Sequence, residues 1–419
     1  MSIRLTAACV RPVALAALLF SSPLVAQNTP PNSTPGAGGT QPAQPPAPQA
    51  LPPATPGLNF SGVIFGSWNY QMPTTPVQLR NQNNNEFVVD RAYLTFRMPA
   101  GDHTSIRITT DVFRSTDSTS NAYTIRAKYA YLQYEGSKLS NGVTVTGRVG
   151  IIQNVVIDYL ENFWPRYLSQ AATERSGYFS SADVGIATLV TFPNKMGEIY
   201  ANVVNGPGYT TRERDRFKDF GIRFTYTPLM NYPPGSLLQT FTVVAWGYKG
   251  ALPSAFVNGG PGQVGTVGDA LDRSRAGLFV GIRDPRLVLG GEFAERHDGG
   301  ETGLNTALSP RGTTTATGRL LSAFTVVRPF AFTDDHHKSP FGVLLRYDHV
   351  SPFVSSSGFV SAPSSSNAYH VLIGGLFADL SQRAQLAFDY QESLASDNGV
   401  STAPPAQLKG YYAHFNVNF

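Results

Sequence analysis

Cysteine, charge and long apolar runs are all scarce in this chain. One of its 419 residues is cysteine, and 14% are charged, against roughly 25% in an ordinary soluble domain. The lack of cysteine argues against a small disulfide-stapled secreted fold. The lack of repeated apolar runs of about 20 residues excludes a polytopic helical membrane protein. A formal net charge of +4 is too slight to indicate nucleic-acid binding.

The abundant residue types favour β-structure. The chain holds 19 Tyr, 26 Phe and 40 Gly, together with many Thr and Ser. Aromatic and β-branched residues fit the pleated surface of a strand, and glycine suits turns between strands. The composition therefore predicts a large all-β protein.

The first 56 residues have the composition of a targeting signal followed by a spacer. Arg4 and Arg11 precede a short apolar run at 13–20, and small residues follow up to Ala26, which predicts a cleaved signal peptide at 1–26. An uncleaved anchor is the alternative, although the run is too short to span a bilayer. Cys9 would be removed with this peptide. Residues 27–56 are rich in Pro, Gly, Ala and Gln, which predicts a disordered periplasmic segment that acts either as a tether or as a plain leader.

From residue 57 to 419 the chain repeats one kind of unit. Apolar and polar side chains alternate, which is the period of a β-strand, and turn-rich stretches separate the alternating segments. About sixteen strands are expected, near 58–72, 85–99, 104–115, 121–135, 142–156, 183–193, 197–208, 217–228, 237–250, 274–284, 286–297, 315–328, 340–351, 367–380, 383–394 and 406–419.

The connections between these strands alternate in length. Short links such as 100–103, 194–196, 284–286 and 381–383 would lie at one rim, and mostly longer links at the other. Short periplasmic turns and long extracellular loops are typical of a transmembrane antiparallel β-barrel. The links 116–120 and 329–339 depart from this rule.

The end of the chain carries a resemblance. Tyr411, Phe415 and Val417 share one face of the last strand, which ends at Phe419. This resembles the closing signature of bacterial outer-membrane porins, and the stretches 90–97 (DRAYLTFR) and 147–153 (GRVGIIQ) are similar to early strands of the phosphate-selective porin O and P family. The resemblance implies a homotrimer in the outer membrane, in contact with lipid and lipopolysaccharide and inserted by the barrel-assembly machinery.

Alternation assigns the faces of the expected strands. Apolar residues face lipid, so the polar parity faces the pore. On the second to fifth strands this places six basic residues on one wall: Arg91, Arg97, Arg107, Arg126, Lys128 and Arg148. The same alternation predicts that Tyr129 and Tyr131 face outward. The opposite wall is mixed in charge, with Arg223, Arg275, Arg283, Arg346, Arg383, Asp219, Glu292, Asp348 and Asp389 facing inward. Basic pore linings favour anions, and the alternative is a lumen with no strong preference.

The third outer loop, 157–182, is the longest. We expect it to fold into the barrel and narrow it, with a short helix over 160–168; the alternative is a loop that covers the outer rim or a subunit interface. The residues expected to shape this constriction are Asp158, Glu161, Trp164, Arg166, Glu174 and Arg175. Acidic residues on the loop facing the basic wall would create a transverse field.

These observations predict a passive channel for small polar solutes, with anions such as phosphate preferred. No catalytic residue, metal or cofactor is expected, since residues 334–337 (DDHH) read as a solvated turn and adjacent residues cannot all converge on one ion. One alternative is a barrel enzyme of the lipase or protease type, using His349 with Ser351, or His370. The other is a secreted soluble all-β binding protein.

Overall fold

The computed structural model describes residues 57–72, 85–115, 122–213, 215–253, 270–302, 312–334, 338–357, 368–395 and 409–419. The expected signal peptide (1–26) and Pro-rich segment (27–56) lie outside these described residues, and both stay predictions.

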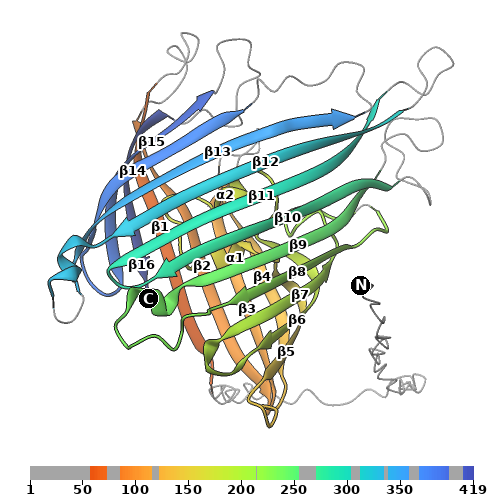
Figure 1. Cartoon of the computed structure of the whole chain (residues 1–419), viewed down its shortest axis with the longest axis horizontal. Helices are drawn as coiled ribbons and strands as arrows, with labels where there is room; N and C mark the ends of the chain where they lie inside the picture. The colour runs from red at the N-terminus through yellow and green to blue at the C-terminus, as the bar shows by residue number, and fades with distance from the viewer. Residues whose placement is uncertain are drawn as a thin grey trace, which may run out of the picture. The chain divides into compact units, whose positions relative to one another are not determined.

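The described residues form a closed antiparallel β-barrel of sixteen strands (Figure 1). Each strand pairs with its neighbours in chain order, and the first strand pairs with the last. Closure leaves no edge whose N–H and C=O groups lack partners. The all-β barrel expectation is confirmed, and each expected span overlaps one observed strand. The strands are β1 Asn59–Gln71, β2 Asn85–Gly101, β3 Thr104–Arg114, β4 Tyr123–Glu135, β5 Thr144–Gln153, β6 Ala182–Thr191, β7 Gly197–Val204, β8 Asp219–Tyr226, β9 Thr242–Pro253, β10 Ala270–Arg283, β11 Leu287–Thr302, β12 Gly312–Val327, β13 Phe341–Ser357, β14 Tyr369–Asp379, β15 Ala384–Ala395 and β16 Lys409–Asn418.

The outer face of the barrel is apolar, and the inner face is polar. On β8, for example, Asp219 and Arg223 are buried inside, whereas Phe220 and Phe224 are 57% and 49% exposed outside. Exposed aromatic residues lie toward both ends of the outward faces, as in the girdles of membrane barrels: Phe60, Tyr134, Tyr226 and Phe341 at one end, and Tyr123, Phe220, Tyr347 and Tyr411 at the other. This distribution is the reverse of a water-soluble fold.

The two rims differ in the length of their connections. One rim, here called the short-turn rim, carries links such as 102–103 and 284–286, and the opposite long-loop rim carries 154–181. The expected asymmetry is confirmed. Two short-turn links are longer than the rest, 227–241 and 328–340, and each contains a short 3₁₀ turn, η3 Leu237–Thr240 and η4 Pro329–Phe332. Only the second was expected to be long.

The C-terminal residues lie at the junction of β16 with β1. Backbone hydrogen bonds join Phe419 and Gly62 in both directions, at 2.8 and 3.0 Å. The Phe419 ring covers Gly62 on the outside, so closely that a Cβ there would lie 2.4 Å from a ring carbon, and Phe415 covers Gly66 in the same way. The last strand therefore packs aromatic rings over side-chain-free positions of the first.

The helices are short. They are α1 Ile157–Leu160, α2 Ala172–Arg175 and the 3₁₀ turns η2 Pro193–Lys195, η3 and η4. Within the described parts of the chain, no helix is both long and apolar enough to cross a bilayer.

Candidate functional site

The loop between β5 and β6, residues 154–181 and here called the inner loop, runs through the inside of the barrel. Its aromatic side chains pack edge-on against inward-facing rings of distant strands. Phe163 contacts Phe279 with ring centroids 4.8 Å apart, and Trp164 contacts Phe324 at 5.4 Å. Trp164 is only 2% exposed. The expectation that this loop enters the barrel is confirmed, and the alternative position over the outer rim is wrong.

The expected helix over 160–168 is wrong in position. Helices form instead at Ile157–Leu160 and Ala172–Arg175, and turns connect them. Pro165 explains the break, because proline disfavours the helical conformation of the residue before it and lacks the N–H that a helix needs.

Side chains of the mixed wall hold the inner loop in place. Arg346 donates to the carbonyl of Gln170 at 2.7 Å, and Arg223 donates to the carbonyl of Val155 at 2.9 Å. Arg346 also binds Asp348 in a pair that is almost fully buried. The inward parity of these arginines was predicted correctly, but they bind loop backbone rather than facing open lumen.

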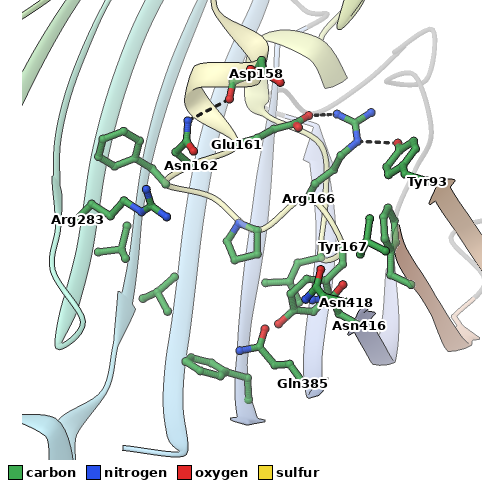
Figure 2. A pocket seen from close by; sticks show the side chains of 18 of the residues that line it. Tyr93, Asp158, Glu161, Asn162, Arg166, Tyr167, Arg283, Gln385, Asn416 and Asn418 are labelled. Atoms are coloured by element: carbon green, nitrogen blue, oxygen red, sulfur yellow. Dashed lines mark hydrogen bonds and ion pairs between the residues drawn. The ribbon is translucent and has the colours of Figure 1, made fainter. Parts of the chain in front are cut away.

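A charged clamp fixes the shape of the inner loop (Figure 2). Arg166 contacts Glu161, binds both carboxylate oxygens of Glu174 at 2.6 and 3.0 Å, and donates to the Tyr93 hydroxyl of β2 at 3.1 Å. Burial raises the pKa of Glu161 above its usual value, although Arg166 opposes this rise. Burial disfavours the charge on Arg166, yet Glu161 and Glu174 hold its pKa above the usual value.

This clamp changes the charge expected on the loop. Glu161 and Glu174 are both compensated by Arg166. Asp158 has no salt bridge within the described residues, and its carboxylate accepts a hydrogen bond of 3.4 Å from the Tyr129 hydroxyl. The acidic side of the expected transverse field therefore reduces largely to Asp158. Trp164 and Arg175 belong to the packed part of the loop.

The six basic residues expected to line the pore differ in their partners. Arg91 and Arg126 both bind the fully buried Asp111 of β3, at 3.1 and 2.9 Å. Arg148 donates to the side-chain carbonyls of Gln133 and Gln153. Arg97, Arg107 and Lys128 have no salt bridge within the described part of the chain. Three of the six cations therefore have no carboxylate partner among the described residues, Arg148 is held by amides, and Arg91 and Arg126 share one carboxylate.

The inward aromatic rings of β4 correct one prediction. Tyr129 and Tyr131 were expected outward, but both are buried inside the barrel. The register of β3 with β4 shifts by one residue at Lys128, and such a bulge reverses the parity of every later side chain. Arg107 lies over the Tyr129 ring at 4.6 Å, and Lys128 lies over the Tyr93 ring at 4.3 Å. Aromatic faces thus support these cations without neutralising them.

A cavity of about 890 Å³ lies between the inner loop and the short-turn half of the barrel (Figure 2). Its cations without a salt bridge in the described residues are Arg107, Lys128 and Arg283. Of its other charged residues, Arg328 pairs with Asp379, and Asp284 pairs with Arg286 outside the cavity. The lining includes Phe65, Tyr93, Thr95, Arg107, Lys128, Tyr129, Asp158, Glu161, Arg166, Tyr167, Arg283, Asp284, Arg328, Gln385, Asn416 and Asn418.

The cavity is therefore positive in balance and is here called the positive cavity. Arg283 was placed only in the mixed wall by sequence, because nothing in its own strand shows which far residues it faces across the barrel.

The candidate catalytic group lies on the outer face. The Ser351 hydroxyl is 3.0 Å from Nε2 of His349, and Nδ1 of His349 is 3.2 Å from Nδ1 of His370. The orienting partner of His349 is thus a second imidazole. Across the described residues, no group of three or more His, Cys, Asp or Glu side chains is arranged to hold a metal. Residues 335–337 of the expected solvated turn lie outside the described residues.

Solved porin structures resemble this barrel. It aligns with OmpF of Salmonella typhi at a TM-score of 0.58 and 9% identity, over 86% of this chain and 97% of that one. It aligns with OmpT of Vibrio cholerae, an outer membrane protein in trimer form, at 0.52 and 9%, over 86% and 98%. An anion-selective porin from Comamonas acidovorans aligns at 0.50 and 10%, over 86% and 98%. No family model and no curated protein sequence matches the chain.

The chain has a porin fold. At 9–10% sequence identity, the likeness to these structures supports the sixteen-strand architecture alone. The function therefore depends on the residues inside the barrel.

Proposed function

We propose that this protein is a bacterial outer-membrane porin through which small polar solutes diffuse, with a preference for anions such as phosphate. The observation that carries the proposal is the cavity beneath the inner loop, where Arg107, Lys128 and Arg283 face a single uncompensated acid, Asp158, among the described residues. Phosphate is the solute class that the resemblance to the phosphate-selective porin O and P family implies.

The outer face supports the membrane part of the proposal. Large apolar side chains lie on the outside of the barrel wall, as Phe224, Leu278, Leu345 and Phe388 illustrate with exposures of 49% to 54%. A soluble all-β binding protein would expose this surface to water, which favours aggregation. In a bilayer the same surface is matched by lipid chains, and the closed sheet satisfies its own hydrogen bonds.

Selection in this channel needs no covalent step. An anion that enters the cavity meets guanidinium and ammonium groups whose charges are not cancelled by neighbouring carboxylates, which lowers its energy there relative to a cation. The inner loop sets the size limit, because it fills the middle of the barrel and leaves separate cavities beside it, including one of about 230 Å³ that reaches Glu198 and Arg223.

We also propose a homotrimeric assembly in the outer membrane, in contact with lipopolysaccharide and inserted by the barrel-assembly machinery. One structural neighbour is described as a trimer, and the sixteen-strand architecture is shared with it.

The channel is favoured over the barrel enzyme. Ser351 and His349 lie within nucleophile–base distance, but a general base becomes an imidazolium during acyl transfer, and a carboxylate stabilises that charge where a second imidazole does not. Replacing Ser351 with Ala should therefore leave conductance unchanged, and the native protein should hydrolyse neither phospholipid nor a nitrophenyl ester.

Reconstitution in a planar lipid bilayer tests the proposal. Under a salt gradient, the reversal potential should favour anions. The double variant R107Q/K128Q should lose most of this preference, whereas R319Q should keep it, because Arg319 carries the same charge on the outer face of the barrel. A cation-favouring reversal potential in the native protein would refute the anion preference. An absence of conductance from folded protein would refute the channel.

A further inference from the structure

Two histidines lie next to each other on the outer face of the barrel. His349 of β13 and His370 of β14 are directly opposite in the strand register, and their ring centroids are 4.7 Å apart. Their chain neighbours Asp348, Val350 and Val371 are buried inside the barrel, so alternation turns both imidazoles outward. His370 is the second residue of its strand, which places the pair close to the long-loop rim.

Three possible ligand atoms converge at this pair. Nδ1 of His349 lies 3.2 Å from Nδ1 of His370, and the Tyr347 hydroxyl contacts the same Nδ1 of His370. An imidazole nitrogen offers either one N–H or one lone pair, so Nδ1 of His370 makes one good hydrogen bond at a time, although two polar atoms approach it. A cation held between the two rings would instead use the lone pairs of both nitrogens at once.

The distance between the two nitrogens fits a shared metal ion. Imidazole nitrogens bind zinc at about 2.0–2.1 Å in tetrahedral geometry, which places two such nitrogens about 3.3–3.4 Å apart. The 3.2 Å between His349 and His370 therefore requires almost no movement of either ring. Imidazole also suits Cu²⁺ and Ni²⁺, so the geometry fits divalent ions of this group in general.

The surroundings of the pair support a metal-binding tautomer. The Ser351 hydroxyl lies 3.0 Å from Nε2 of His349, and when Nε2 donates to this hydroxyl, Nδ1 carries the lone pair that a metal needs. Metal-binding histidines almost always have such a partner on their other ring nitrogen. Arg319 lies opposite Ser351 on β12, and Glu295 compensates its charge.

We propose that His349 and His370 bind one divalent transition-metal ion of the copper and zinc class through their Nδ1 atoms. The Tyr347 hydroxyl lies within reach as a third ligand, and the remaining coordination position is open to water or to an oxygen atom of a membrane head group. A structural metal centre holds its ion with four protein ligands, whereas this site has fewer, so it binds metal reversibly. A bound ion joins β13 to β14 on the outside of the barrel.

Titration of Cu²⁺ into full-length protein in detergent, without an added histidine tag, tests the site by calorimetry and electron paramagnetic resonance. The native protein should bind Cu²⁺ with hyperfine coupling to two nitrogens. His349→Ala and His370→Ala should each weaken this binding at least about tenfold and abolish the two-nitrogen coupling. The double variant His336→Ala/His337→Ala is the matched control, because it removes two imidazoles from the link 328–340 and should keep both the affinity and the coupling.

Absence of Cu²⁺ binding to the native protein would overturn the proposal, and so would equal affinity in the native protein, His349→Ala and His370→Ala. Binding that only the His336→Ala/His337→Ala variant loses would overturn it as well. Should an alanine variant fail to fold, His349→Gln or His370→Gln replaces it, and two-nitrogen coupling that persists there would refute the site. None of these measurements uses conductance, so failure of the metal site and failure of the proposed channel are distinguishable.

Discussion

Replacing Arg166 with Gln removes the cation at the centre of the inner-loop clamp. Arg166, Glu161 and Glu174 have side-chain exposures of 11%, 19% and 9%, so solvent would compensate the two remaining carboxylates poorly. Removing one partner of a buried ion pair typically costs about 3–5 kcal/mol. We expect this cost to destabilise the docked loop rather than the barrel, since the strand ladders do not involve Arg166.

Single-channel recording measures the consequence. Arg166→Gln should show a larger and noisier open-channel current than the native protein, because the loop would leave its docked position part of the time. Thermal unfolding of the barrel should change little. Arg175→Gln is the matched control in the same loop. Its guanidinium donates to the Ser169 hydroxyl at 3.3 Å and has no carboxylate partner within the described residues, so its removal should leave the current quiet.

The pH dependence of this variant gives a second check. Burial already raises the pKa of Glu161, and loss of Arg166 removes an influence that lowers it. The neutral acid is the form that a buried site tolerates, so acidification should stabilise the docked loop in Arg166→Gln and quieten the current at a pH above the usual range of a glutamate. A current that is native-like at neutral pH, or that grows noisier on acidification, would refute the reasoning.

Three further predictions concern selectivity and closure. Lys128→Gln should lower anion preference more than Arg126→Gln, as read from reversal potentials, because Lys128 lines the positive cavity and Arg126 is paired with a buried carboxylate. In the native protein, acidification should increase anion preference before ordinary carboxylates lose their charge, because burial raises the pKa of Glu161; a reversal potential that changes only as ordinary carboxylates titrate would contradict this. Gly62→Val should impair barrel closure, since a Cβ at Gly62 meets the Phe419 ring at 2.4 Å; heat-dependent electrophoretic mobility reports closure, and the added Phe419→Ala change should restore it.

Period-2 alternation was sufficient to predict the strands, because each strand meets two different environments on its two faces. The same pattern failed at Lys128, where a bulge turns Tyr129 and Tyr131 inward. A bulge is a backbone event, and the sequence around it (RAKYAY) still alternates well enough to hide it. The bulge at Asp90 was missed for the same reason.

The position of the inner loop was predictable and its contacts were not. A long loop with Phe163, Trp164 and Tyr167 has apolar bulk that water does not accommodate, which favours an interior position. The residues that anchor the loop were not predictable from the sequence. Arg346 binds the Gln170 carbonyl across a separation of 176 residues, and only the closed barrel brings them together.

Net charge says little about what such a channel selects, because pairing decides which charges a solute meets. The chain has 32 basic and 28 acidic residues, a nearly even balance. Inside the barrel, Asp111, Glu161 and Glu174 are each occupied by an arginine, whereas Arg107 and Lys128 rest on tyrosine rings. A ring face stabilises a cation but does not cancel its field. The bulge at Lys128 contributes to this division, because it turns tyrosines toward the cations of the positive cavity. The polarity of the proposed pathway thus depends in part on a single-residue register shift, which places two tyrosine rings where sequence alternation predicts none.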